Sequence, residues 1–332
     1  MFWYLLTTGY VFLLVAPSTS LSPHAIIYLS LLFSVIIPLL TAAYMVITHD
    51  SSVSKPAPIW VPGLHGELAN HNFCEEDYYF THHVAEFHNT WSSLPLIFIG
   101  GVGPYYTRQY ATKEVRFSAS FVSVGAVGVG SALFHASLLR FGQVLDEVPM
   151  LLIIFAGIYC FVENDAPTTK SNYGLWLPLL LIATCFTLVA AYLIFYLYEV
   201  FLLSFGGGVC MLLYLAISAE NKPALATTIL KVAFMFIAIG FSCWLLDNFC
   251  CTHVHWLRLH VFWHIFTGLS GYMFTLFMIT LRASSHQQIP SLVVTSFRGT
   301  GWELQNKGTW SVTDRPQFIL PYVKYSKKCD GQ

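Results

Sequence analysis

Three histidines in otherwise apolar segments are the residues best placed to hold a metal ion. His260 and His264 are four residues apart in LHVFWHIFTG, and His135 lies in GSALFHASL. Side chains four residues apart stack on one helical face, as two ligands of a tetrahedral metal do. With His135 as third ligand and a water as fourth, the set is typical of a catalytic zinc site. The spacing alone also fits interfacial histidines that hydrogen-bond to their neighbours.

Two further side chains could act on a substrate at such a metal. Ser131 precedes His135 by four residues, so it shares the helix face and could offer a hydroxyl. Asp146 opens the next expected span in QVLDEVPM, and its carboxylate could serve as general base and then as acid. Alternatively, Ser131 bonds only to its own helix backbone, and Asp146 and its neighbour Glu147 are interfacial acids that reach water.

A second group of ligand-type side chains precedes the first core span. In HNFCEEDYYFTHHVAEFHNT, residues 71–90, Asn72, Glu75, Asp77 and Glu86 offer hard oxygen atoms. Calcium takes about six to eight oxygen ligands of this kind. The stretch is not an EF-hand loop, because the glycine of that motif is missing. It therefore predicts either a calcium site of another design or a solvated acidic loop.

The composition places these groups in a membrane protein. Hydrophobic residues make up 56% of the 332 residues, charged residues only 10%, and the mean hydropathy is +0.62. Soluble domains are about one quarter charged. The net charge of -1 gives no sign of a basic surface for nucleic acid. The membrane is therefore the expected partner and source of substrate.

Apolar runs of about 20 residues predict the transmembrane helices. We expect an all-α polytopic fold with seven core spans, near residues 88–106, 117–138, 147–162, 174–195, 199–218, 228–247 and 260–281. Residues 24–47 predict an additional span, while the run at 2–16 is too short to decide. The polar chain from Arg282 onward predicts a solvent-exposed, partly disordered tail.

The distribution of positive residues predicts the orientation. Loops 107–116, 163–173 and 219–231 and the tail carry most of the Lys and Arg residues and should face the cytosol. The chain then divides into N-terminal hydrophobic segments (1–50), a luminal or extracellular loop (51–87), a seven-helix core (88–281) and a cytosolic tail (282–332). All three histidines fall at the outer ends of their spans. Cys74, Cys250 and Cys251 also lie on that side, where a disulfide is permitted.

Five motifs together resemble one known family. NFCEEDY with Glu86 and Asn89 downstream, GSALFHASL, LDEVPM, DNFCC and HVFWHIFTG have the order and approximate spacing of the alkaline ceramidases, over residues 72 to about 281. The resemblance implies a seven-helix intramembrane hydrolase fold, shared more distantly with adiponectin-type and progestin-type receptors.

The resemblance also implies site residues. It implies zinc ligands at His135, His260 and His264 and active-site residues at Ser131 and Asp146. Its calcium ligands map to the side chains of Asn72, Glu75, Asp77 and Glu86 and to the backbone carbonyl of Phe73. This chain departs from the usual family pattern of Asp, Trp and Asn with Asn72, Phe73 and Asp77. An outer disulfide is implied between Cys74 and Cys251, with the adjacent Cys250 as the other possible partner.

The expected activity is hydrolysis of the amide bond of ceramide or a close relative, with the lipid held in the bilayer. We expect the membrane of the endoplasmic reticulum or Golgi, with the active site on the luminal side. A heptahelical lipid receptor with the same histidines and a phospholipid or GPI-lipid remodelling hydrolase are the alternatives. A transporter is disfavoured because the polar groups lie at the outer ends of the spans rather than near mid-bilayer.

Overall fold

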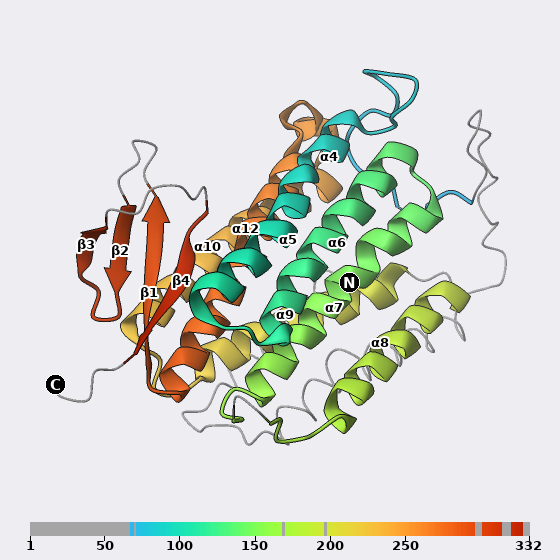
Figure 1. The fold of residues 1–332 in the computed structure, drawn as a ribbon. Helices are drawn as coiled ribbons and strands as arrows, with labels where there is room; N and C mark the ends of the chain where they lie inside the picture. The colour runs from blue at the N-terminus through green and yellow to red at the C-terminus, as the bar shows by residue number, and fades with distance from the viewer. Residues whose placement is uncertain are drawn as a thin grey trace.

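The structure is a computed structural model that describes residues 67–69, 71–167, 170–195, 198–295, 301–313 and 320–327. The expected hydrophobic segments at 2–16 and 24–47 lie outside the described residues. Figure 1 shows a bundle of long helices with a small sheet on one flank. The helices are α4 (Phe87–Ser92), α5 (Leu94–Tyr106), the π-helix η2 (Thr107–Ala111), α6 (Val115–Ser137), α7 (Arg140–Val162), α8 (Trp176–Phe195), α9 (Tyr198–Ser218), α10 (Ala224–Phe249), α11 (Cys251–Val254), the 3₁₀ helix η3 (His255–Leu257) and α12 (Leu259–Ser285).

Six of the described helices are long and apolar enough to cross a membrane, namely α6, α7, α8, α9, α10 and α12. They coincide with six of the predicted spans, so the predicted helical multi-pass membrane fold is confirmed. The remaining span, expected at 88–106, is instead two consecutive helices, α4 and α5, that meet at Ser93. Pro95 explains the break, because it has no N–H and its ring clashes with the carbonyl four residues earlier.

Helices α6 and α7 form a tight antiparallel pair joined by a short turn at Leu138. Leu138 ends α6 in the left-handed conformation (φ 51°), and α7 begins two residues later. A Cβ atom on Gly130 would lie 2.0 Å from the carbonyl oxygen of Leu145 and 2.5 Å from the backbone nitrogen of Asp146. Only glycine allows this approach, which brings the Ser131 turn of α6 against the Asp146 turn of α7.

A four-stranded antiparallel sheet follows α12, so the prediction of a solvent-exposed, partly disordered tail is wrong for its described residues. The strands β1 (Gln288–Thr295), β2 (Gly301–Gln305), β3 (Trp310–Thr313) and β4 (Tyr322–Lys327) have the order β3-β2-β1-β4. Leu292, Leu304 and Val323 are buried against α10 and α12. The Tyr272 hydroxyl of α12 also donates to the carbonyl of Pro321, at 2.6 Å. The strands are short, and β1 has consecutive apolar residues at 292–294, so the strict alternation that identifies a strand in a sequence is missing.

The opposite ends of the bundle are held together by different contacts. At the end near the sheet, buried Arg282 donates to Glu114 (3.0 Å) and to the carbonyl of Ala166 (2.6 Å), which joins α12 to the segments before α6 and after α7. At the other end, a disulfide joins Cys74 to Cys251. The histidines lie at the disulfide end.

Candidate active site

The three histidines predicted as metal ligands lie together, although 125 residues of sequence separate His135 from His260. One ligand atom from each of His135, His260 and His264 lies within 4.8 Å of the other two, and all three side chains are buried. His135 projects from α6, and the other two project from successive turns at the start of α12. Two helices thus supply a compact set of three imidazoles, the number that leaves one tetrahedral position open for chemistry.

The outward nitrogen of two of these imidazoles is fixed by a hydrogen-bond partner. His135 Nδ1 pairs with Glu86 Oε2, and His264 Nδ1 lies 2.8 Å from Ser92 Oγ. Within the described structure, His135 Nε2 and His260 Nδ1 are buried and have no hydrogen-bond partner. Buried polar atoms without a partner are costly, whereas a metal ion would satisfy them. A carboxylate or hydroxyl behind a histidine is also the usual support of a zinc ligand, so this donor set fits zinc.

The short helix α4 carries both supporting groups. Glu86 is its N-cap, and the preceding segment pairs with the end of α6 through the N–H groups of Ala85 and Glu86, which donate to the carbonyls of Ala136 (3.0 Å) and His135 (2.9 Å). The Asn89 amide donates to Glu86 Oε2 at 3.0 Å, and Ser92 Oγ donates to the Asn89 carbonyl at 3.0 Å. One turn of helix therefore orients both histidines.

The structure places Ser131 in the site. Its side chain is buried, and its Oγ lies 3.3 Å from His264 Nε2. Ser93 Oγ donates to Ser131 Oγ at 3.0 Å, so the Ser131 oxygen already accepts one bond. Its own proton is then donated to His264 Nε2, and it becomes available to another group beside the imidazoles when a metal ion binds that nitrogen.

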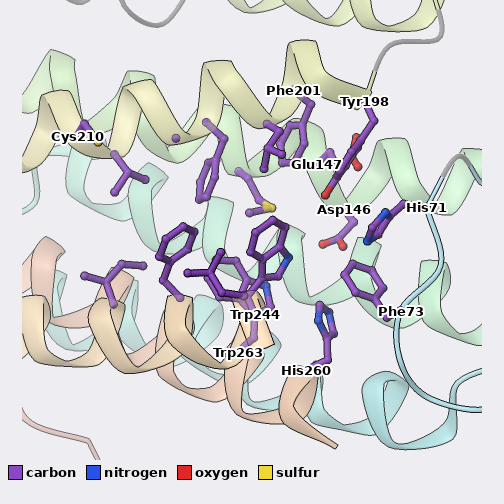
Figure 2. Close-up of a pocket in the computed structure, with 18 of the residues that line it drawn as sticks. His71, Phe73, Asp146, Glu147, Tyr198, Phe201, Cys210, Trp244, His260 and Trp263 are labelled. Atoms are coloured by element: carbon purple, nitrogen blue, oxygen red, sulfur yellow. The ribbon is translucent and has the colours of Figure 1, made fainter. Parts of the chain in front are cut away.

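The structure places Asp146 at the same end of the bundle but deeper than expected. Helix α7 begins at Arg140, so Asp146 lies nearly two turns inside it, and the prediction that it opens the span is wrong. Its side chain lines a cavity that His260 also lines, as Figure 2 shows. Glu147 is buried at 5% exposure and accepts a hydrogen bond from Gln143 Nε2 at 2.8 Å. It is therefore not a side chain that reaches water.

The cavity has a volume of about 370 Å³ and lies between α9 and α10. The walls away from the histidines are apolar and largely aromatic, and include Phe201, Phe205, Phe241, Trp244 and Trp263. Polar side chains gather at one end, where Asp146, Tyr198, His71 and His260 are seen in Figure 2. The arrangement offers a long apolar chain a place in the cavity and offers a polar group a place beside the imidazoles.

The acidic loop is folded against this site. Glu75 is buried and accepts from the N–H groups of His88 (2.8 Å) and Asn89 (2.9 Å), so it caps the N-terminus of α4. The Phe73 N–H donates to Glu86 Oε1 at 3.2 Å. Asn72 Nδ2 donates to Asp77 Oδ2 at 3.2 Å. The residues expected to bind calcium thus lie around one loop, and two of them already hold backbone N–H groups.

The carboxylates of this loop influence one another. Burial raises the pKa of Glu86 to about 7, and the charge of Glu75 adds to the rise. Burial also raises the pKa of Asp77, and the nearby charges of Glu86 and Glu75 add to it. Neighbouring like charges of this kind are relieved when a cation binds between them.

Asp247 and His71 are two residues of the site that were not predicted from the sequence. Asp247, in the DNFCC motif, is buried, and its carboxylate accepts the N–H groups of Cys74 (3.2 Å) and of His260. Cys74 is bonded to Cys251, and Cys250 is free. His71 lines the cavity but carries no role in the resemblance. An acid at the end of an apolar span was the available signal for Asp247, whereas nothing in the sequence distinguishes Ser92 or Ser93 from other membrane serines.

Comparison with known proteins identifies the family of the chain. A family model described as Ceramidase matches residues 66–301. Among curated proteins, the chain is 31% identical to a putative alkaline ceramidase, dcd3A, of Dictyostelium discoideum, over 64% of this chain and 85% of that protein. It is 30% identical to alkaline ceramidase 3 of Mus musculus, over 64% and 83%, and 27% identical to the alkaline ceramidase YPC1 of Saccharomyces cerevisiae, over 69% and 83%. Since the family model covers more than half of the chain and includes all three histidines, Ser131 and Asp146, the chain belongs to the Ceramidase family.

Proposed function

We propose that this protein hydrolyses the N-acyl amide bond of ceramide, or of a close relative such as phytoceramide or dihydroceramide, and releases a sphingoid base and a fatty acid. The observation that carries the proposal is the position of three buried imidazoles at the polar end of a largely aromatic cavity. The relatives named as alkaline ceramidases support the same reaction. A substrate with two long chains and a central amide fits such a cavity, because its chains can stay among apolar side chains while its amide meets the polar end.

The zinc ligands in this proposal are His135, His260 and His264. When bound, a zinc ion supplies Lewis acidity towards the amide carbonyl and lowers the pKa of a coordinated water towards about 7. Glu86 and Ser92 hold two of the ligands in the required orientation.

The remaining steps belong to two side chains of α6 and α7. Asp146 takes a proton from the attacking water and passes it to the leaving nitrogen, so that the amine departs neutral. Ser131 donates a hydrogen bond to the carbonyl oxygen as negative charge develops there. Ser93 supports this role because its hydroxyl occupies an acceptor site of Ser131 and leaves the Ser131 proton available.

We infer that the acidic loop binds calcium through the side chains of Asn72, Glu75, Asp77 and Glu86 and the carbonyl of Phe73. The mutual repulsion of Glu75, Asp77 and Glu86 supports a cation here. A calcium ion would stabilise the loop that places Glu86 behind His135.

We further propose that the enzyme lies in the membrane of the endoplasmic reticulum or Golgi, with the histidines on the luminal side. The positive loops lie at the opposite end of the bundle, and the Cys74 disulfide lies at the histidine end. A protease-sensitive tag inserted near residue 65 should be protected in sealed microsomes, and a tag cleaved from the cytosolic side would contradict this orientation.

The proposed activity is tested on the purified full-length protein in detergent. Its metal content is measured, and the products formed from a mixed pool of sphingolipids and phospholipids are identified by mass spectrometry. We expect about one zinc per chain and release of sphingoid bases. His264→Ala should lose both zinc and turnover, whereas His255→Ala, at an exposed histidine on the same side, should lose neither. Release of fatty acid from phospholipids alone would favour a remodelling hydrolase, and zinc without turnover of any lipid would favour a receptor.

A further inference from the structure

His71 presents an unused hydrogen-bonding atom at the polar end of the cavity. Its Nε2 is buried and has no partner within the described structure, while the side chain of Asn248 hydrogen-bonds to the ring. The ring is held in place by aromatic neighbours. It stacks on Tyr198, with centroids 5.0 Å apart and planes at 11°, and its edge meets Phe73 at 4.5 Å. A polar atom fixed in such a position is expected to have a partner in the working enzyme.

The position of His71 relative to the histidine triad limits what that partner can be. The Phe73 ring lies 4.5 Å from the His71 ring and 3.8 Å from the His260 ring, so a single aromatic ring separates His71 from the triad. Figure 2 shows His71 beside Asp146, with Phe73 between His71 and His260. A group that reaches His71 while the amide lies at the triad must therefore belong to the polar headgroup of the substrate, within a few bonds of the amide.

The chemistry of the surroundings selects a hydroxyl group. Asp146 and Glu147 line the same end of the cavity, so an anionic group would meet two acids. An apolar group would leave Nε2 buried and unpaired, which is unfavourable. A hydroxyl both donates and accepts, so it can pair with Nε2 in either tautomer of the imidazole.

We propose that His71 is a specificity-determining residue whose Nε2 hydrogen-bonds to a hydroxyl group of the sphingoid base next to the scissile amide. This inference rests on the proposed hydrolysis of ceramide-type lipids. It assigns Tyr198, Phe73 and Asn248 the role of holding the imidazole in position. The aromatic part of the cavity then receives hydrocarbon, and His71 distinguishes a hydroxylated base from one that lacks the hydroxyl.

The test compares ceramide with two synthetic analogues, one without the C1 hydroxyl and one without the C3 hydroxyl, on the wild type and on His71→Phe. Phenylalanine retains the stacking on Tyr198 but removes the nitrogen. For the wild type, kcat/KM should fall by about tenfold or more for at least one analogue, because a site built for a hydroxyl rejects the analogue that lacks it. In His71→Phe, kcat/KM for ceramide should fall to about the value for that analogue, and the difference between the two lipids should disappear. The exposed His255→Phe should keep the wild-type preference.

A binding measurement separates recognition from turnover. The affinity of the wild type for a sphingoid base should exceed its affinity for the matching deoxy base, and His71→Phe should bind the two equally. His71→Gln, which keeps an uncharged acceptor, should restore part of the preference. The inference is overturned if neither hydroxyl affects the wild type, or if His71→Phe lowers kcat/KM equally for all three lipids. A wild type that cleaves no N-acylated base at all would instead refute the proposed hydrolysis itself.

Discussion

Replacing Ser92 by alanine should weaken zinc binding without removing any ligand. The Ser92 hydroxyl lies 2.8 Å from His264 Nδ1, and both side chains are buried. In a zinc complex that uses Nε2, the Nδ1–H group would donate to this hydroxyl. The backbone of Asn89 also hydrogen-bonds to the His264 ring, so the variant removes one of two groups that support the imidazole.

The magnitude follows from the kind of bond that is lost. Because the bond to the Asn89 backbone remains, the loss is that of one hydrogen bond, about 0.5–1.5 kcal/mol, and each 1.4 kcal/mol is about a tenfold change in an equilibrium constant. Loss of the partner behind a metal-bound histidine typically lowers metal affinity by about 10- to 100-fold, and we expect the lower end of this range, about tenfold.

The assay is a competition between the protein and a zinc chelator of known affinity, with bound metal and turnover measured on the same samples. We expect Ser92→Ala to lose zinc at an about tenfold lower concentration of free chelator and to regain turnover when zinc is added in excess. Ser242→Ala is the matched control, because its hydroxyl bonds only to the Ala238 carbonyl of its own helix and its side chain is exposed. An unchanged zinc affinity in Ser92→Ala would refute the supporting role, as would a loss of turnover that excess zinc does not restore.

Four further variants test other parts of the site. Asp146→Asn should retain zinc but lose about 10²- to 10⁴-fold in rate, the usual contribution of a general base, and an undiminished rate would remove Asp146 from the mechanism. Asn72→Asp combined with Asp77→Asn keeps three acids in the loop and should leave calcium affinity and the calcium-dependent rise in melting temperature nearly unchanged. Asp77→Asn alone removes one charge and should weaken both, and equal behaviour of the single variant and the parent would indicate a solvated acidic loop. Gly130→Ala places a methyl group 2.0 Å from the Leu145 carbonyl, so it should destabilise the protein by about 1–3 kcal/mol or more and lower turnover. Wild-type melting and activity in that variant would show that α6 and α7 can separate without consequence.

Local patterns in the sequence were sufficient for the helical membrane core. A transmembrane helix can be recognised from a single segment, because about 20 apolar residues suffice to cross the hydrocarbon layer. The spacing of His260 and His264 likewise defines a shared face as soon as the segment is helical. The motifs around Ser131, His135 and Asp146 indicated the family, since together they match a pattern that extends over most of the chain.

The tertiary structure decided which residues work together. No local pattern predicts that His135 lies beside the two histidines of α12, or that Ser92 contacts His264. These contacts depend on how α4, α6 and α12 pack. The depth of Asp146 was set by the start of α7 at Arg140, which lies among apolar and polar residues that give no clear boundary. The sheet after α12 escaped prediction because its strands are short and its apolar face is buried only when it meets α10 and α12. Composition and helical periodicity are properties of a single segment, so the sequence determines them directly. The site depends on distances between segments, which are defined only once the chain has folded.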